Sequence, residues 1–187
     1  MKIVVVSQNL LNHDYGVSLS ASVLLRLNLA WHEQLRSAAN LLERYKEYKI
    51  FLDVPVGRKK PPSFEHTIKD VALLVADFAN IEYVAISNIE YSHQILYYQR
   101  KIKGAKIVPK IETYTGIKNI KDIINVLNYE DKVVMLDHQD LYSDLVGREK
   151  EREFLELVDY LDKTCRDKEV CLLRTVGIVF SSWENLK

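Results

Sequence analysis

Residues 105–145 read AKIVPKIETYTGIKNIKDIINVLNYEDKVVMLDHQDLYSDL, and this stretch decides the predicted fold. It contains two short apolar runs, Ile107 to Ile111 and Val133 to Leu136. Between them, apolar residues at positions 117, 120, 123, 124 and 127 recur at the spacing of one helix face. The stretch therefore predicts a strand, a helix and a second strand, with polar residues just past the carboxyl ends of both strands.

Polar side chains at these two strand ends indicate a binding site. Alternation along a strand places Lys110 and Glu112 on the same side of the first strand. A carboxylate there and another among residues 137–140 would hold Mg²⁺, which binds a few carboxylates, waters and substrate oxygens. A nearby lysine would then neutralise an enolate or a phosphoryl group. The alternative is that Lys110 and Glu112 form an exposed pair at a strand end.

Strand and helix patterns alternate along the rest of the chain. We expect further strands within residues 2–6, 24–29, 50–52, 81–87 and 169–180, and helices within residues 17–23, 32–48, 64–80, 92–103 and 148–163. This alternation predicts an α/β fold with a parallel sheet. An eight-stranded barrel usually takes ~250 residues. We therefore expect residues 1–187 to form a single domain, a short and incomplete (β/α) TIM-type barrel of about seven strands.

An incomplete barrel exposes two sheet edges, and exposed edges tend to pair with other chains. We therefore expect a homo-oligomer in which a second copy covers them.

The strand at residues 24–29 carries a polar face. Alternation places Arg26 and Asn28 on that face and leucines on the other. A buried arginine is costly without an anion, so Arg26 either meets a carboxylate of the protein or binds a ligand.

Composition limits the classes of partner. The chain has 26 basic and 26 acidic residues and no long basic run, so nucleic acid is not an expected partner. No apolar stretch approaches the ~20 residues of a membrane span, and the first apolar run is too short for a signal peptide. Cys165 and Cys171 form no metal-binding pattern, so reduced thiols and a cytoplasmic location are expected.

Five segments, in chain order, resemble the strand ends of one enzyme family. They are LLRLNLAW at residues 24–31, IFLDVPVGR at 50–58, YVAISNIEYSHQI at 83–95, VPKIETYTGIKNI at 108–120 and MLDHQDL at 135–141. They are similar to the R-L-N-F-S, L-L-D-x-x-G-P-x-x-R, A-S-F, K-I-E-N-x-x-G-x-x-N and R-G-D-L-G segments of pyruvate kinase. The chain thus resembles the catalytic barrel of pyruvate kinase, within the phosphoenolpyruvate/pyruvate barrel superfamily.

The resemblance implies roles for individual residues toward a small anionic substrate. Arg26 would bind the phosphate or carboxylate of that substrate, and Lys110 would stabilise the transferring phosphoryl group and the enolate. Thr175 lies near the position of the family's seventh-strand threonine, which implies a contact with the substrate. Arg26 and Lys110 are therefore the candidate catalytic residues.

The resemblance also implies two cation sites. Glu112 and Asp140 would bind Mg²⁺, with Asp137 at the strand end as a competing ligand. Asn28 and Asp53 match positions where the family binds a monovalent cation such as K⁺, beside the substrate. The family's serine two places after that asparagine is Ala30 in this chain, which weakens the implied K⁺ site.

Two differences from the pyruvate kinase pattern limit the reactions expected of this chain. Only residues 55–63 stand where pyruvate kinases insert a lid domain, and no counterpart of their carboxyl-terminal domain is present in the sequence. Because phosphoryl transfer needs water excluded, ADP phosphorylation is not the expected activity, although lid-free phosphoryl transfer stays open. The segment MLDHQDL is also similar to the citrate-lyase-like aldolases. We expect a lyase or transferase that forms an enolate of phosphoenolpyruvate, pyruvate or a related 2-oxo acid; the alternative is a catalytically degenerate barrel that binds a metabolite or a partner protein.

Overall fold

The computed structural model describes residues 5–6, 24–58, 62 and 64–175. The expected helix at residues 17–23 lies outside these ranges, as do parts of the first and last expected strands, residues 2–4 and 176–180.

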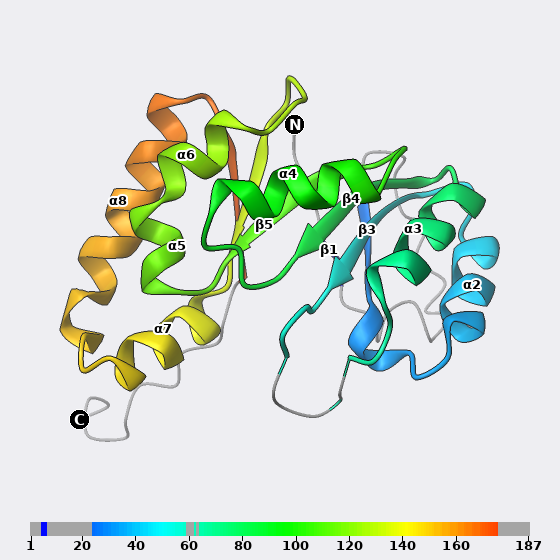
Figure 1. The fold of residues 1–187 in the computed structure, drawn as a ribbon, viewed down its shortest axis with the longest axis horizontal. Coiled ribbons are helices and arrows are strands. Elements are labelled where there is room, and N and C mark those ends of the chain that lie inside the picture. The colour runs from blue at the N-terminus through cyan, green and yellow to red at the C-terminus, as the bar shows by residue number, and fades with distance from the viewer. Residues whose placement is uncertain (1–4, 7–23, 59–61, 63, 176–187) are drawn as a thin grey trace, which may run out of the picture.

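The described residues form one parallel sheet, in which the strands lie side by side in the order β1 to β7 (Figure 1). The strands are β1 (Val5–Val6), β2 (Leu24–Asn28), β3 (Lys49–Val54), β4 (Ile81–Ile86), β5 (Lys106–Ile111), β6 (Val133–Leu136) and β7 (Cys171–Arg174). The sheet curls into a half (β/α) barrel with β1 and β7 as its end strands, which confirms the predicted incomplete barrel. That a second copy covers these ends stays a prediction.

From β2 onward, helices connect consecutive strands and pack on the outer face of the sheet (Figure 1). They are η1 (Leu29–Trp31), α2 (Leu35–Arg44), α3 (Ile68–Asp77), α4 (Ser92–Lys101), α5 (Tyr114–Lys118), α6 (Ile120–Asn125), α7 (His138–Gly147), η2 (Glu151–Glu153) and α8 (Phe154–Asp167). Among the described residues, none of these helices has the length and apolar character needed to cross a bilayer.

The two faces of the sheet carry different side chains because alternate residues point to opposite sides. The outer face is apolar and packs against the helices; it includes Leu25, Leu52, Val84, Ile107 and Val134. The inner face is apolar from the beginning of the strands as far as Ala85 in β4 and Met135 in β6. Toward the carboxyl ends, the inner face becomes charged, and this change of character positions the candidate site.

The prediction was wrong about the segment after β6. A helix, α7, begins at residue 138, and α8 begins at residue 154 rather than at residue 148. The side chain of Asp137 caps α7 by accepting a hydrogen bond from the Asp140 N–H. The chain then turns at Glu149, whose φ of 57° lies in the left-handed region. The charged stretch that follows therefore cannot extend α7 as a continuous helix.

The expected helix after β5 is divided in two at Asn119, which ends α5 and begins α6. The Asn119 amide donates to the carbonyl oxygen of Glu90 at 2.9 Å, which holds the break against the segment after β4. Gly116 permits this approach, because a Cβ there would lie 2.6 Å from the backbone oxygen of Ile89. Two residues of the K-I-E-N-x-x-G-x-x-N-like segment thus fix the helix that follows Glu112.

Candidate metal and anion site

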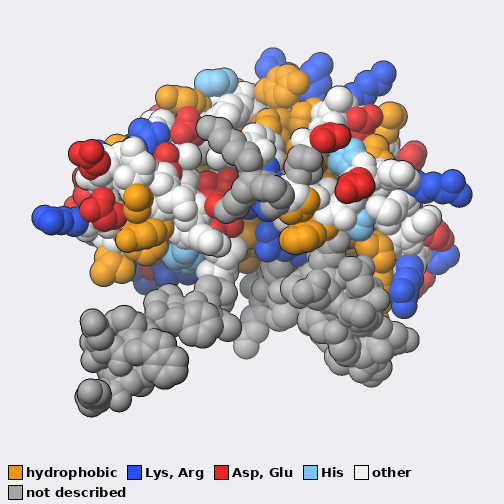
Figure 2. Space-filling model, turned by 90° about the horizontal axis from the view of Figure 1, so that it is seen from below, with side chains coloured by type: hydrophobic (Ala, Val, Ile, Leu, Met, Phe, Trp, Pro, Cys, Tyr) orange, Lys and Arg blue, Asp and Glu red, His pale blue; other side chains and the backbone are white. Residues whose placement is uncertain are grey.

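A cavity of about 480 Å³ opens where strands β2 to β6 end. Figure 2 views the molecule from this side and shows both acidic and basic side chains near the middle of the face. The cavity is lined by Arg26, Asn28, Pro55, Gly57, Arg58, Ser87, Asn88, Lys110, Glu112, Thr113, Asp137, Asp140, Ser143 and Asp144. Parallel α/β folds bind ligands at this end of the strands.

Behind the cavity, the fully buried carboxylate of Asp53 lies between two cations. Its Oδ2 accepts a hydrogen bond from Arg26 Nε at 3.0 Å, and its Oδ1 lies 3.2 Å from Lys110 Nζ. Burial alone would raise the pKa of Asp53, but the charges of Lys110 and Arg26 outweigh burial and hold that pKa below its usual value. Arg26 was expected either to meet a carboxylate of the protein or to bind a ligand, and the structure shows that it meets the carboxylate of Asp53.

Lys110 and Glu112 point to the same side of β5, as alternation predicts. Lys110 Nζ lies 3.0 Å from Glu112 Oε1 and donates to Ser87 Oγ at 2.9 Å. Both charged residues are only 4% exposed, so the alternative of an exposed pair is wrong. Burial tends to lower the pKa of Lys110, but the Asp53 and Glu112 carboxylates raise it above its usual value, so this lysine keeps its proton.

Three carboxylates converge beside Lys110. One oxygen each from Glu112, Asp137 and Asp140 can be chosen so that all three lie within 4.8 Å of one another. Glu112 follows β5, Asp137 follows β6, and Asp140 lies in the first turn of α7. Burial raises the pKa of Glu112, and the nearby Lys110 offsets only part of that rise. This acidic triad can hold a hard cation, because each member offers an oxygen ligand.

The positions of Asp137 and Asp140 allow either residue, or both, to bind the metal. Sequence reasoning treated them as competitors, and the structure brings both to the same place as Glu112. Acidic side chains also outnumber basic ones among the described residues around the cavity. A divalent cation would offset that difference.

Asn28, Asp53 and Thr175 have their own contacts in the fold. Asn28 lines the cavity, and its Oδ1 accepts a hydrogen bond from Ala30 N at 2.9 Å. The Asp53 oxygens already face two cationic side chains, Arg26 and Lys110. Binding of K⁺ at Asn28 and Asp53 stays a prediction. Thr175 lies beside the cavity rather than in its lining: its Oγ1 accepts from the His138 N–H at 3.3 Å.

Sequence reasoning assigned no role to Ser87 or Asn88. Ser87 Oγ, besides accepting from Lys110, donates to Glu112 Oε1 at 3.3 Å. The Asn88 N–H donates to the other oxygen, Oε2, at 2.7 Å. These residues follow β4, and only their place at a strand end next to β5 could have indicated that they contact Glu112.

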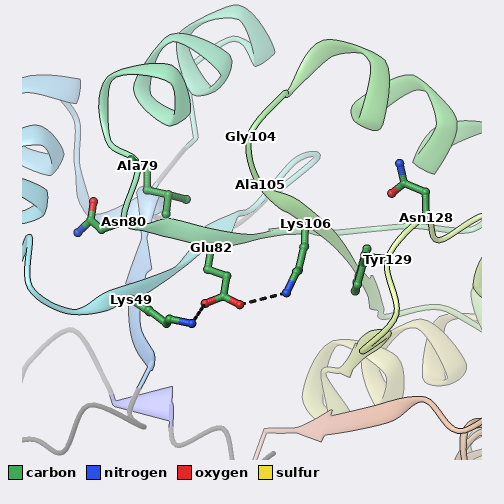
Figure 3. Close-up of a pocket in the computed structure, with 10 residues that line it drawn as sticks. Lys49, Ala79, Asn80, Glu82, Gly104, Ala105, Lys106, Asn128 and Tyr129 are labelled. Carbon is green, nitrogen blue, oxygen red and sulfur yellow. Dashed lines mark hydrogen bonds and ion pairs between the residues drawn. The ribbon is translucent and has the colours of Figure 1, made fainter.

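A second cavity, of about 440 Å³, lies at the opposite end of the sheet, where the strands begin (Figure 3). Glu82 lies there between Lys49 and Lys106, at 2.7 and 3.1 Å, as the dashed lines show. Lys106 also lies over the ring of Tyr83, 5.0 Å from its centroid. This network joins the beginnings of β3, β4 and β5, and in barrels this end contributes to stability rather than chemistry.

Comparisons with known proteins agree with this architecture at the level of fold. No family model matches the sequence, and no curated protein matches it. A structural match is the crystal structure of RipC from Yersinia pestis, with a TM-score of 0.60 and 10% sequence identity, covering 87% of this chain and 74% of that chain. At this identity the likeness concerns the fold alone. It supports the assignment of a curled parallel half-barrel.

Proposed function

We propose that the cavity at the strand ends binds Mg²⁺ together with a small 2-oxo acid such as pyruvate or phosphoenolpyruvate, and that the protein acts on this acid through an enolate. The observation that carries the proposal is the convergence of Glu112, Asp137 and Asp140 next to a buried lysine. In this proposal Glu112 and one or both aspartates hold the metal. The resemblance to the phosphoenolpyruvate/pyruvate barrels supports the choice of substrate class.

The chemistry follows from the charges around the cavity. A bound divalent ion supplies a Lewis acid for the carbonyl and carboxylate oxygens of the substrate. Lys110 keeps its proton, so it would neutralise the developing enolate oxygen rather than accept a proton. Arg26 is 24% exposed and lines the same cavity, where it would face the carboxylate or phosphate of the substrate.

One observation favours the alternative of a barrel that binds without turnover. Arg26 and Lys110 both contact Asp53, so part of their charge is already balanced inside the protein. A substrate anion must share these cations with a buried carboxylate. Turnover can be tested by incubating the protein with pyruvate and Mg²⁺ in D₂O: enolate formation exchanges the methyl protons for deuterium, whereas binding alone does not.

Binding is tested by thermal unfolding with Mg²⁺, alone and with oxalate, an enolate mimic. A ligand present at 100 times its Kd adds roughly 2.7 kcal/mol to the free energy of unfolding. We expect Mg²⁺ to raise the Tm, oxalate to raise it further, and Glu112→Gln to abolish both shifts. Glu82→Gln, a matched change at the other end of the sheet, should keep both. A wild-type protein with no shift under either condition would contradict the proposal.

A further inference from the structure

We infer that Asn88 is a positioning residue that ties the turn at residues 55–58 to the candidate metal ligand Glu112. It contacts both partners, through different atoms. The Asn88 peptide N–H donates to Glu112 Oε2 at 2.7 Å, and its side-chain Nδ2 donates to the backbone oxygen of Val56 at 2.7 Å. The inference rests on the proposed metal site, because it assigns a support to one of that site's ligands.

The backbone of Asn88 has the conformation that this arrangement requires. Its φ is 57°, in the left-handed region, which asparagine tolerates better than most residues. Gln94 at the start of α4 contributes a second restraint, since its Nε2 donates to the Asn88 carbonyl oxygen at 3.4 Å. The peptide group before Asn88 therefore aims its N–H at the carboxylate while the side chain reaches back to the turn.

The turn packs closely against the Asn88 side chain. Gly57 has a φ of 76°, and a Cβ there would lie 3.2 Å from Asn88 Nδ2, so glycine suits both the backbone and the space. The turn is closed by the Arg58 N–H, which donates to the Pro55 oxygen at 3.2 Å. Pro55, Gly57 and Arg58 also line the cavity. Moving this turn would therefore move a part of the cavity wall and the support of Glu112 together.

This link has a thermodynamic consequence. The other Glu112 oxygen, Oε1, faces Lys110 and Ser87, and the Asn88 N–H holds Oε2. Residues that orient a metal ligand typically change metal affinity by about 10- to 100-fold when they are replaced. If a ligand that contacts the turn alters metal affinity, then the metal must alter the affinity of that ligand by the same factor.

The test compares Asn88→Gly and Asn88→Ala with the wild-type protein by calorimetric titration of Mg²⁺. The glycine variant keeps the N–H and tolerates the left-handed backbone, but it loses the bond to Val56. The alanine variant loses that bond and also disfavours the backbone conformation. We expect Kd for Mg²⁺ to rise about 10-fold in the glycine variant and at least as much in the alanine variant.

Asn80→Ala is the matched control. Asn80 also donates from its side-chain amide to backbone oxygens, those of Tyr45 and Tyr48, at 3.3 and 3.2 Å, but at the opposite end of the sheet. This variant should lower the Tm without changing Kd for Mg²⁺. A purely structural role of Asn88 would instead give the same pattern for both asparagines, a lower Tm with Kd within twofold of the wild-type value, and would overturn the inference.

A second measurement separates this inference from the metal site itself. Hydrogen exchange of the residue-88 amide, followed by NMR without metal, reports the bond to Glu112 directly. We expect its protection to fall about 10-fold in Asn88→Gly and in Gly57→Ala, and to stay unchanged in Asn80→Ala. A wild-type protein that binds no Mg²⁺ would end the proposed function, whereas unchanged protection in both variants would overturn the role of Asn88.

Discussion

At each end of the sheet a carboxylate lies between two cationic side chains, but the two groups differ in burial. Where the strands begin, Glu82 is 21% exposed, and its partners Lys49 and Lys106 are 65% and 35% exposed. Where the strands end, Asp53 is fully buried, and Lys110 is 5% exposed at its side chain. The first group is a solvated network across strands, whereas in the second the carboxylate and the lysine are removed from water and only Arg26 is partly exposed.

This difference in burial separates a structural contact from a candidate site. Exposed ion pairs contribute about 0–1 kcal/mol to stability, so the Glu82 network needs no function beyond joining strands. Burying charges costs free energy, and the fold offsets that cost at Asp53 with two cations. The same end also gathers Glu112, Asp137 and Asp140. A strongly perturbed group of charges in a cavity is a typical sign of a functional site.

Neutralising the central carboxylate at each end of the sheet should give the largest difference in the free energy of unfolding. Asp53→Asn removes the carboxylate that faces Arg26 and leaves Lys110 with Glu112 alone, and breaking a buried pair costs about 3–5 kcal/mol. Glu82→Gln should cost about 0–1 kcal/mol. Urea unfolding of the two variants measures both values. Equal losses in the free energy of unfolding would show that burial does not distinguish the two ends.

Neutralising the aspartates of the triad should change metal affinity rather than stability. Asn caps a helix about as well as Asp, so Asp137→Asn should keep α7 in place. Loss of a ligand charge should raise Kd for Mg²⁺ by about 10-fold or more at the residue that binds the ion. Calorimetric titration of Asp137→Asn and Asp140→Asn will show which one it is. A Kd unchanged in both variants would remove the aspartates from the site.

Acidification should give the smallest effect. The pKa of Asp53 is lowered in the folded protein, against about 3.9 when unfolded. Between these two pKa values the unfolded state therefore binds more protons, and the contribution of Asp53 to stability is lost as the pH falls through its folded pKa. The difference in unfolding free energy between wild type and Asp53→Asn should shrink over that range. A difference that grows instead would mean that Lys110 and Arg26 do not control this carboxyl.

Local patterns predicted much of the site, because alternation along a single strand decides which way its side chains point. The pairing of Lys110 with Glu112 follows from their spacing, and so does the inward direction of Arg26. The partner of Arg26 could not be predicted from β2 alone. It depends on the register of β2 against β3, which sets Asn28 opposite Asp53.

The features that sequence reasoning missed depend on contacts between distant segments or on weak patterns. In α7 only Leu141 and Leu145 are buried, so its apolar pattern is too sparse to indicate a helix, and Asp137 reads as a ligand rather than a cap. The bond from Asn88 to Val56 spans 32 residues, and a left-handed φ leaves no mark in the sequence beyond the asparagine itself. The conformational propensities of single residues do not predict such contacts.

The most direct test of the metal site is anomalous diffraction from crystals grown with Mn²⁺, which takes the same oxygen ligands as Mg²⁺. We predict an anomalous peak within coordination distance of Glu112 and of Asp137, Asp140 or both. The peak should disappear in Glu112→Gln and remain in Glu82→Gln. The absence of a peak among these three carboxylates at saturating Mn²⁺ would contradict the proposed metal site.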